Sequence, residues 1–584
     1  MRNPFSSDWM RGAAGSTQRP QGGLSYVAGA SDDPLQFVTV SGLLDRAVRQ
    51  WGAGQAAVFA DTGEWLSWHD LSRRADDVAA GLLALGIGRG ERVGIWAPSC
   101  VEWLLVQFGT ARIGAILVNI NPAYRSSELE YALNKVQCRA LVLARSLKSS
   151  DYVAILRSIA PEIDRVASGE RLRVERLPRL RHTVLLGDGP RPPGLQSFAD
   201  LSRLAGPAHR ARLATLSAEL DPDDAINIQF TSGTTGAPKG ATLSHFNIVN
   251  NARYCAQAMA LGERDRLCIP VPLYHCFGMV LGVLSCAAVG ATMVFPAPAF
   301  DAEATLRAVH AQRCTALHGV PTMFMAILDH PRFSEFDLSS LRTGIMAGAP
   351  CPIETMRRVV GEMHMNEVTI AYGMTETSPI SFQSGVGDPL EKRVTTVGRI
   401  QPHAEVKIVD AAGCIVPIGQ SGELCTRGYL VMRGYWEDPE RTHEAIDAAR
   451  WMRSGDLATI DADGWCNIVG RAKDMLIRGG ENVFPREVEE FLQGHPKVQA
   501  VQVFGVPDKR YGEEVCAWIV LKPGQTATPD EIRSFCQDRV AHYKVPRHIR
   551  FVSEFPLTAT GKPQKFVMRE QMTRTLGVEV ERTA

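Results

Sequence analysis

Residues 231–240 read TSGTTGAPKG and follow directly on the apolar run AINIQF at 225–230, which we predict to be a buried strand. Glycines let the backbone approach a polyphosphate closely, so that its N–H groups surround the oxygens, while hydroxyls add donors and Lys239 adds a positive charge. A solvated turn needs only one or two such residues. Pro238 and Gly240 stand where a Walker A loop requires Gly and then Ser or Thr, so this is a different phosphate loop. The sequence predicts a phosphate-binding site made of Thr231, Ser232, Gly233, Thr234, Thr235, Gly236, Ala237, Pro238 and Lys239.

Apolar strands and amphipathic helices alternate on the N-terminal side of this loop. Helices are expected at 40–51, 70–85, 102–113 and from 127, and strands at 92–97, 115–120 and 139–143. This alternation predicts an α/β fold with parallel-rich sheets covered by helices. The segment 145–220, which is rich in Arg, Pro and Gly, is expected to be loosely structured.

Two later strands end in polar loops in the same way. The predicted strand 343–347 leads into Gly348-Ala349-Pro350, and the strand 367–371 leads into the loop 372–377. Ligands of open α/β sheets collect beyond the carboxyl ends of strands. The three loops are therefore expected to line one site.

The length of 584 residues predicts more than one domain. From 394 to 471 the composition changes to short strands and Gly-rich turns, and a small α+β unit follows, with helices at 486–493 and 529–541 and strands at 500–505 and 514–521. We predict a disordered leader at 1–30, a large N-terminal domain at 31–471, a hinge at 472–474 and a small mobile C-terminal domain at 475–584.

Composition narrows the function classes. Lys+Arg and Asp+Glu both number 63, and a protein without a basic surplus is not expected to bind nucleic acid. The 13 cysteines show no CxxC pair, which favours a reducing, cytoplasmic location, with an organelle-targeting leader as the alternative. The uncharged run 267–300 is interrupted by prolines and glycines, so we predict a buried helix and a strand at 292–295 and no membrane span.

The decapeptide resembles the phosphate-binding signature of the adenylate-forming superfamily, which includes acyl-CoA synthetases, luciferases and the adenylation domains of peptide synthetases. The same resemblance is carried, in order, by GATLSHFNIVNNA (240–252), PLYHCFGMVLG (272–282), AYGMTET (371–377), VMRGYWEDPERTHEAID (431–447), GRAKDMLIRGGENVFPREVEEF (470–491) and PLTATGKPQK (556–565). It extends from about Val40 to Leu576 and is closest to medium-chain fatty acyl-CoA synthetases. The resemblance implies an ATP-dependent acid:CoA ligase, which forms an acyl-adenylate and pyrophosphate and then an acyl-CoA and AMP.

The resemblance also implies roles for residues around the nucleotide. Glu376 would bind Mg²⁺, since a hard cation takes carboxylate and phosphate oxygens, and Thr375 would donate to the α-phosphate. The adenine would lie against Tyr372, in Tyr372-Gly373-Met374, and beside Gly348, Ala349 and Pro350, while Asp456 and Arg471 would bind the ribose hydroxyls. On pattern alone, the loop at 372–377 can instead be a capping turn that starts a helix at Thr377 or Ser378.

Further roles concern catalysis and movement. Lys562, on the Gly-containing loop 558–562, is implied to neutralise charge on the carboxylate and the α-phosphate during adenylation. His275 resembles the family histidine that gates the acyl pocket, and its alternative is a hydrogen-bonded core histidine. Lys473 would be the hinge residue, and Gly479, Gly480 and Glu481 would then face the thioester arm of CoA.

Several alternatives remain open from the sequence. The acid is predicted to be a medium-chain fatty acid, with an aryl acid of the cinnamate type as the alternative. The acceptor is predicted to be CoA, with a carrier protein as the alternative. The motifs by themselves do not refute a luciferase-like oxidation. A non-catalytic nucleotide-binding module is the alternative of another class, and the joint presence of Lys239, Glu376, Asp456, Arg471 and Lys562 argues against it.

Overall fold

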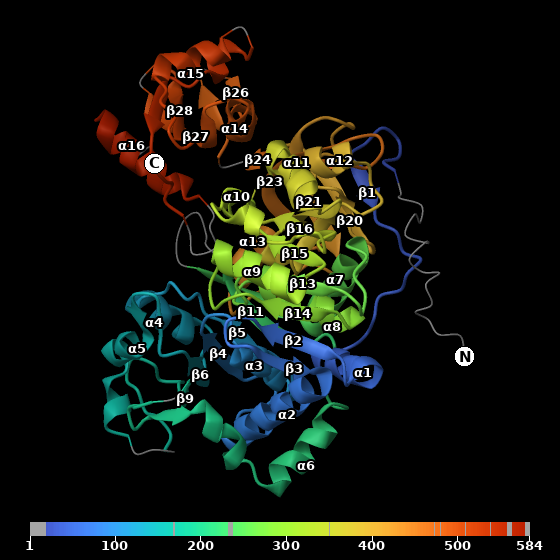
Figure 1. The fold of residues 1–584 in the computed structure, drawn as a ribbon, viewed down its shortest axis with the longest axis vertical. Coiled ribbons are helices and arrows are strands. Elements are labelled where there is room, and N and C mark those ends of the chain that lie inside the picture. Colours follow the sequence, from blue (N-terminus) through green and yellow to red (C-terminus); the bar gives the residue numbers. More distant parts are fainter. Residues whose placement is uncertain are drawn as a thin grey trace.

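The computed structural model describes residues 19–166, 170–187, 189–231, 238–349, 351–471, 474–478, 481–508, 510–537, 539–557 and 563–577. Two large sheets covered by helices form the main body, an antiparallel sheet packs beside them, and the C-terminal residues form a separate lobe (Figure 1). The alternation of strands and helices in the sequence therefore produced the predicted parallel-rich α/β architecture.

The eight-stranded sheet carries the predicted phosphate loop. Its strands, in spatial order, are β10 (Leu195–Ser197), β9 (His182–Leu185), β6 (Ala140–Leu143), β4 (Arg92–Trp96), β5 (Ile116–Asn119), β11 (Ala225–Thr231), β12 (Lys239–Ser244) and β22 (Gly434–Tyr435). The strands from β10 to β11 are parallel, whereas β12 and β22 are antiparallel to their neighbours. The helices of this region are α3 (Val101–Arg112), α4 (Ser126–Lys135), α5 (Tyr152–Ile159) and α6 (Pro207–Leu216).

The nine-stranded sheet supplies the other two predicted loops. Its strands, in spatial order, are β19 (Arg399–Ile400), β18 (Ile380–Gln383), β17 (Glu367–Gly373), β16 (Thr343–Ala347), β15 (Ala316–Gly319), β13 (Arg266–Cys268), β14 (Thr292–Phe295), β2 (Gln55–Phe59) and β3 (Glu64–Ser67). The six strands from β17 to β2 in that order are parallel, whereas β18, β19 and β3 pair antiparallel at the two edges. The other helices of the main body are α1 (Val40–Trp51), α2 (Trp68–Ala84), α7 (His245–Ala258), α8 (Ser285–Val289), α9 (Ala302–Gln312), α10 (Pro321–Leu328), α11 (Ile353–Glu362), α12 (Leu390–Thr395) and α13 (Pro439–Ala445).

The remaining strands form two smaller sheets and one hairpin. The antiparallel sheet of the main body contains β1 (Tyr26–Ala28), β20 (Ala404–Val409), β21 (Gly422–Gly428), β23 (Met452–Ile460) and β24 (Cys466–Arg471). The C-terminal lobe contains β26 (Glu481–Val483), β25 (Leu476–Arg478), β28 (Gly512–Leu521), β27 (Val498–Asp508) and β29 (His548–Phe551), with α14 (Pro485–Gln493), α15 (Pro529–Cys536) and α16 (Lys565–Leu576). A short hairpin joins β7 (Ser146–Leu147) to β8 (Ser150–Asp151).

Local chemistry explains why the predicted helices begin where they do. The Thr39 hydroxyl accepts a hydrogen bond from Gly42 N (3.0 Å) at the start of α1. Ser67 and Asp70 form a reciprocal capping box at the start of α2. Such caps satisfy backbone N–H groups that have no partner within the helix. The predicted bounds of α1 are confirmed, and α2 begins two residues before its predicted start.

The segment 145–220 differs from its prediction. It was expected to be loosely structured, but it contains α5, α6, β9 and β10, and the last two strands extend the eight-stranded sheet. All four residues of β9 are buried. The arginines and prolines around this short strand dominated the local composition and concealed it.

The two boundaries of the predicted domains fall partly outside the described residues. Residues 1–18 of the predicted leader are not described, whereas Tyr26–Ala28 form β1 and pair with β20. Ordered structure therefore reaches further toward the N-terminus than residue 31. Ala472 and Lys473 of the predicted hinge are also outside the described residues, between β24 and β25.

The uncharged run 267–300 is buried inside the main body. It forms a π-helix (Phe277–Leu284), α8 and then β14, whose bounds match the predicted strand 292–295. Gly278 is needed at the start of the π-helix because a Cβ there would lie 2.5 Å from the Pro272 carbonyl oxygen. Among the described residues, no helix is long and apolar enough to span a bilayer.

Candidate active site

The phosphate loop connects the antiparallel strands β11 and β12. Thr231 and Lys239 are register partners at its two ends, and Ser232–Ala237 lie outside the described residues. The Tyr131 hydroxyl donates to the Pro238 carbonyl oxygen (3.0 Å), which anchors the second end of the loop. The strand expected before the loop is confirmed, and the ends of the loop are held by the sheet and by α4.

Glu376 meets the first end of the phosphate loop. Its carboxylate atom Oε1 accepts hydrogen bonds from the Thr231 hydroxyl (3.1 Å) and from the Tyr435 hydroxyl (3.0 Å). Among the described residues none donates to Oε2. The Glu376 residue is 8% exposed, so its carboxylate is a largely buried acceptor.

Lys239 lies at the other end of the loop and contacts the same tyrosine. Its Nζ donates to the Tyr435 hydroxyl (2.9 Å) and lies 4.3 Å from the centroid of the ring. Burial and the negative charge of Glu376 raise the pKa of Tyr435, so the phenol stays protonated and can donate to the carboxylate. A cation, a neutral hydroxyl and an anion therefore form one chain beside the loop.

The loop after β17 carries Glu376 in a single 3-10 turn (Thr375–Thr377). The Thr377 hydroxyl accepts from Met374 N (3.1 Å), but no helix follows, because β18 begins at Ile380. The alternative interpretation as the start of a helix is therefore wrong. A Cβ on Gly373 would lie 1.8 Å from the Pro379 carbonyl oxygen, so the tight path of this loop requires glycine.

Tyr372, Asp456 and Arg471 form a second group. The Tyr372 hydroxyl donates to Asp456 Oδ2, and Arg471 Nε lies 3.3 Å from Asp456 Oδ1. Asp456 and Arg471 are register partners on β23 and β24. Burial raises the pKa of Asp456, while Arg471 and the Tyr372 hydroxyl counteract that rise.

The turn after β16 lies beside Tyr372. Ala347 and Ala371 are register partners on the parallel strands β16 and β17, so Gly348 and Ala349, which follow β16, lie level with Tyr372 and Gly373 at the end of β17. Pro350 lies outside the described residues. The sheet therefore brings the predicted adenine turn and Tyr372 to the same edge.

His275 lies on a segment that reaches the same loop. The Sγ atom of Cys276 is 3.8 Å from the Thr375 hydroxyl, and Cys276 N donates to Gln229 Oε1 on β11 (3.0 Å). His275 Nδ1 accepts from Phe277 N (3.2 Å), which fixes the ring relative to the π-helix. Thr375 is therefore contacted by Cys276, the residue that follows the predicted histidine.

A chain of hydrogen-bonded, buried amide side chains holds this segment against the eight-stranded sheet. Gln229 Nε2 donates to Asn227 Oδ1 (2.8 Å), and Asn227 Nδ2 donates to Asn119 Oδ1 (3.0 Å). Asn119 Nδ2 in turn donates to the Tyr274 carbonyl oxygen (2.8 Å). Buried polar groups that are mutually satisfied fix one arrangement, so this chain sets the position of Tyr274 and His275 over the sheet.

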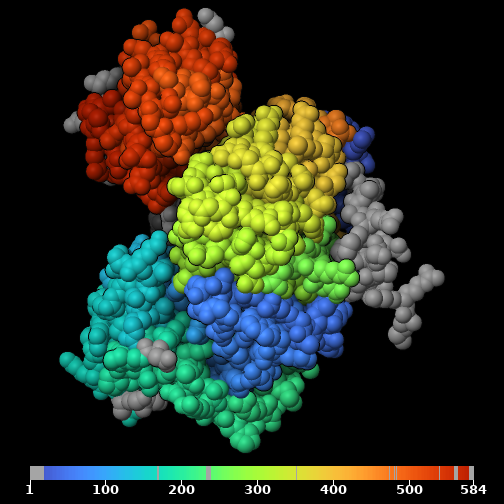
Figure 2. All heavy atoms as spheres, viewed as in Figure 1, coloured from blue at the N-terminus to red at the C-terminus, as the bar shows by residue number. Residues whose placement is uncertain are grey.

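The C-terminal lobe carries the other predicted site residues. Figure 2 shows this lobe projecting from the main body. Lys473, Gly479, Gly480 and Lys562 lie outside the described residues, and Glu481 is exposed on β26, paired with Arg478 of β25. Arg486 Nη1 donates to the Ile468 carbonyl oxygen (2.7 Å), which links α14 to β24 of the main body.

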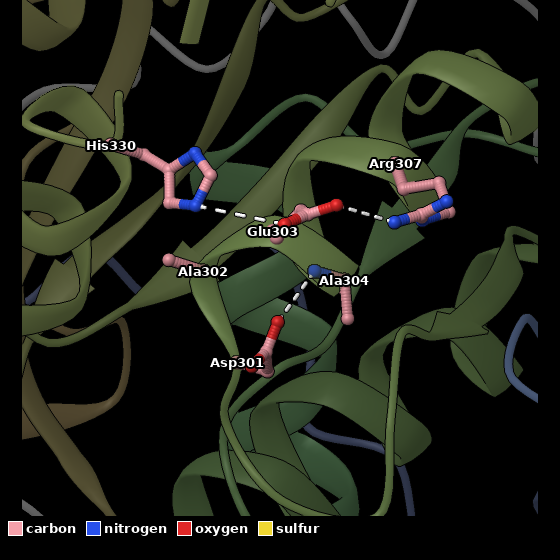
Figure 3. A pocket seen from close by; sticks show the side chains of 6 residues that line it. All are labelled: Asp301, Ala302, Glu303, Ala304, Arg307 and His330. Carbon is pink, nitrogen blue, oxygen red and sulfur yellow. Dashed lines mark hydrogen bonds and ion pairs between the residues drawn. The ribbon is translucent and has the colours of Figure 1, made fainter. Parts of the chain in front are cut away.

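A separate hollow of about 400 Å³ lies at the start of α9 (Figure 3). Asp301 caps Ala304 N (2.7 Å), and Glu303 pairs with Arg307 and lies 3.9 Å from His330 Nε2. These contacts are a helix cap and surface ion pairs, which are common at the start of a helix. None of the predicted site residues lines this hollow.

Comparison with known proteins identifies the class to which this fold and site belong. The family described as "AMP-binding enzyme" matches residues 44–436, and the "AMP-binding enzyme C-terminal domain" matches residues 487–562. The chain therefore belongs to the AMP-binding enzyme family, as the resemblance in its motifs indicated.

Three similar proteins are informative. A medium-chain acyl-CoA ligase of Danio rerio, named ACSF2 and mitochondrial, is 47% identical over 557 residues, which cover 95% of this chain and 91% of the relative. The acyl-CoA synthetase YngI of Bacillus subtilis, which is named as putative, is 47% identical over 534 residues, covering 91% and 97%. A crystal structure of the anthranilate CoA ligase AuaEII with anthranoyl-AMP has a TM-score of 0.83 at 30% identity, covering 94% of this chain and 99% of that chain.

The structure adds residues that sequence reasoning did not select. Tyr435 and Cys276 contact the predicted site residues Glu376 and Thr375, and Gln229 contacts Cys276. These three residues are uncharged and are not glycines of a motif. Tyr435 lies within the stretch 431–447 that resembles the superfamily, which was its only signal. Its importance follows from the pairing of β22 with β12, which the sequence does not reveal.

Proposed function

We propose that the protein is an ATP-dependent acid:CoA ligase that works in two half-reactions at the site described above. In the first, a carboxylate attacks the α-phosphate of ATP and releases pyrophosphate, leaving an acyl-adenylate. In the second, the thiol of CoA takes the acyl group and AMP leaves. The observation that carries this proposal is the buried Glu376 carboxylate, whose Oε1 accepts from Thr231 at one end of the phosphate loop and from Tyr435 on β22, while no described residue donates to Oε2.

The first half-reaction brings two anions together. Two unit charges about 4 Å apart repel by about 4 kcal/mol at an effective dielectric near 20. The proposal assigns compensation to Lys239, to the loop N–H groups of Ser232–Ala237 and to Thr375, which would donate to the α-phosphate. The Cys276–Thr375 contact supports this assignment, because it joins the predicted acid side to the predicted phosphate side.

Mg²⁺ fits the donor set near Glu376. Mg²⁺ is commonly bound by one or two carboxylates together with substrate phosphates and water, and does not need a cage of protein ligands. Among the described residues there is no group of three or more His, Cys, Asp or Glu side chains that could hold a metal ion by itself. We propose that Glu376 Oε2 would hold this ion, which supplies charge neutralisation for the phosphates when bound.

The nucleoside would be held by the second group of residues. Asp456 is proposed to accept from the ribose hydroxyls, with Arg471 beside it, while Tyr372, Gly373, Met374, Gly348, Ala349 and Pro350 would surround the adenine. The bond from Tyr372 to Asp456 supports this role, because it holds both the aromatic ring and the carboxylate in place. The rise in the pKa of Asp456 through burial makes those contacts essential for keeping it ionised.

The second half-reaction requires a change of residues at the site. Lys562 is proposed to act in adenylation and then to leave as the C-terminal lobe turns about Lys473, which brings Gly479, Gly480 and Glu481 toward the thioester arm. The separation of the lobe from the main body, with a short link between β24 and β25, supports a hinge at 472–474. The domain limits 31–471 and 475–584 are proposed on the same basis.

The acid is proposed to be a medium-chain fatty acid that passes His275. The uncharged and mostly buried run at 267–300, which contains this histidine, and the name of the medium-chain acyl-CoA ligase of Danio rerio support this choice. An aryl acid is the second candidate, because the anthranilate CoA ligase has the same fold over 94% of this chain.

A panel of acids tests the proposal. The purified protein is incubated with ATP, Mg²⁺ and CoA, and acyl-CoA is measured for straight-chain acids of increasing length and for benzoate, anthranilate and cinnamate. The expected result is acyl-CoA formation with a maximum among medium-length fatty acids. If acyl-CoA formation is highest with an aryl acid, the substrate is an aryl acid and not a fatty acid. If thioester forms only on a phosphopantetheine carrier protein, that protein and not CoA is the acceptor.

A further inference from the structure

Tyr435 is the buried residue at which the two charged groups of the candidate phosphate site meet. Its hydroxyl accepts from Lys239 Nζ (2.9 Å) and donates to Glu376 Oε1 (3.0 Å). A phenol has one proton to donate and lone pairs that accept, so a single hydroxyl serves both charges at once. The pairing of Tyr435 with Ala241 places it on the strand next to β12, which begins at Lys239.

The chemistry of the two neighbours makes this arrangement significant. An ammonium and a carboxylate in a largely buried site attract each other more strongly than they do in water. If nothing stood between them, Lys239 would form an ion pair with Glu376. Both groups would then be occupied by each other, and the ion pair would have to break before either could turn to a nucleotide.

The hydrogen bonds that Glu376 accepts also agree with a carboxylate held in a fixed position. The Thr231 and Tyr435 hydroxyls both donate to Oε1, and no described residue donates to Oε2. Met432 N donates to the Glu376 carbonyl oxygen (2.9 Å), so the backbone at Glu376 is also held. The carboxylate is thus fixed in direction through Oε1 and the backbone, and within the described part of the chain Oε2 accepts from no donor.

We propose that Tyr435 is a positioning residue that separates Lys239 from Glu376 and thereby keeps Glu376 Oε2 open to a hard cation that arrives with the nucleotide. This inference rests on the proposed ATP chemistry of the same site. Tyr435 touches neither of the reacting atoms in this account. It acts by preventing an ion pair that would compete with Mg²⁺ for the carboxylate.

Replacement of the hydroxyl alone tests the inference. Tyr435→Phe keeps the ring against Lys239 but removes both hydrogen bonds, so Lys239 is expected to bind Glu376. The affinity for ATP is measured by calorimetry at a series of Mg²⁺ concentrations, without any acid. The variant is expected to need about tenfold more Mg²⁺ to reach half of its maximal ATP affinity, the effect of about 1.4 kcal/mol of competition.

A second substitution separates competition from simple loss of structure. Lys239→Met removes the competing cation, so the double variant Tyr435→Phe, Lys239→Met is expected to need less Mg²⁺ than Tyr435→Phe alone, even though its overall ATP affinity is lower. A structural role for Tyr435 predicts no such recovery, because the second substitution then only adds damage. Tyr26→Phe is the matched control, since it removes a tyrosine–glutamate hydrogen bond to Glu405 in a different sheet.

The outcomes distinguish this inference from the proposed function. An unchanged Mg²⁺ requirement in Tyr435→Phe, or no recovery in the double variant, overturns the positioning role. If Tyr435→Phe does not fold, Tyr435→Leu is compared with the double variant Tyr435→Leu, Lys239→Met in the same way, and no recovery of the Mg²⁺ requirement on loss of Lys239 overturns it. Because ATP binding is measured directly, these results hold whether or not any acid is activated.

Discussion

Thr231 and Glu376 are 145 positions apart in the sequence, yet the Thr231 hydroxyl donates a 3.1 Å hydrogen bond to the Glu376 carboxylate. One residue ends β11 of the eight-stranded sheet and the other follows β17 of the nine-stranded sheet. The contact therefore joins the phosphate loop of one sheet to the acidic loop of the other.

Glu376→Gln removes the negative charge and keeps an oxygen that can accept from Thr231 and Tyr435. Because the uncharged amide is a much poorer ligand for a hard cation, we expect pyrophosphate exchange to fall by roughly 100-fold or more. Exchange rates at several Mg²⁺ concentrations measure the effect. Glu405→Gln is the matched control, because Glu405 also accepts from a tyrosine but lies in the antiparallel sheet. An equal loss in both variants would remove the special role of Glu376.

Asp456→Asn tests the proposed ribose site. The wild type is expected to prefer ATP over 2′-deoxy-ATP and 3′-deoxy-ATP, since a carboxylate accepts strongly from both hydroxyls. The variant is expected to raise the KM for ATP by about tenfold, the effect of losing a hydrogen bond to a charged group, and to reduce this preference. Measurement of the KM for ATP, 2′-deoxy-ATP and 3′-deoxy-ATP in the wild type and the variant tests both expectations. A variant that retains the full preference would place the ribose elsewhere.

Gln229→Met tests the support of the His275 segment. The substitution keeps the volume but leaves Cys276 N and Asn227 Oδ1 without their partner, at a cost of about 1–3 kcal/mol for each buried group. We expect the KM for the acid to rise more than the KM for ATP, and the urea midpoint of unfolding to fall. A change confined to ATP would contradict the proposed link from Gln229 to the acid side.

His318 provides a prediction about pH. Burial lowers the pKa of this fully buried imidazole from its ordinary 6.5 to about 4. The unfolded chain therefore takes up a proton that the folded chain refuses as the pH falls from 6.5 to 4. The free energy of unfolding is expected to lose about 3 kcal/mol over this window through His318, and no more below it.

His318→Gln removes that contribution and can still donate to the Leu281 carbonyl oxygen, the partner of His318 Nε2. Urea unfolding at pH 7.0 and at pH 4.5 measures the slope in both proteins. The variant is expected to lose less stability between the two pH values than the wild type does. Equal losses would show that His318 does not titrate differently in the folded and unfolded chains.

Much of the fold could be predicted because its elements are determined locally. The bounds of α1 and β14 were predicted without error, since a cap at Thr39 and the buried, uncharged tetrapeptide at 292–295 define them. The strands before the three loops were predicted for the same reason. Strand β9 was missed because four buried residues do not outweigh the arginines around them.

The site could be predicted only as a set of candidates. Glycines, hydroxyls and charged residues mark the loops, but their contacts depend on how the strands are ordered. The bond between Tyr372 and Asp456, and the position of Tyr435 between Lys239 and Glu376, arise from sheets that no local pattern determines. The roles of Lys562, Gly479 and Gly480 stay predictions, because these residues lie outside the described part of the chain.

The measurement that tests the central claim most directly is acid-dependent exchange of labelled pyrophosphate into ATP, without CoA. We predict that label enters ATP when a medium-chain fatty acid is present and that it does not when the acid is omitted. Lys562→Ala is expected to abolish this exchange while still converting supplied acyl-adenylate to acyl-CoA. Failure of label to enter ATP with any fatty or aryl acid would contradict the account.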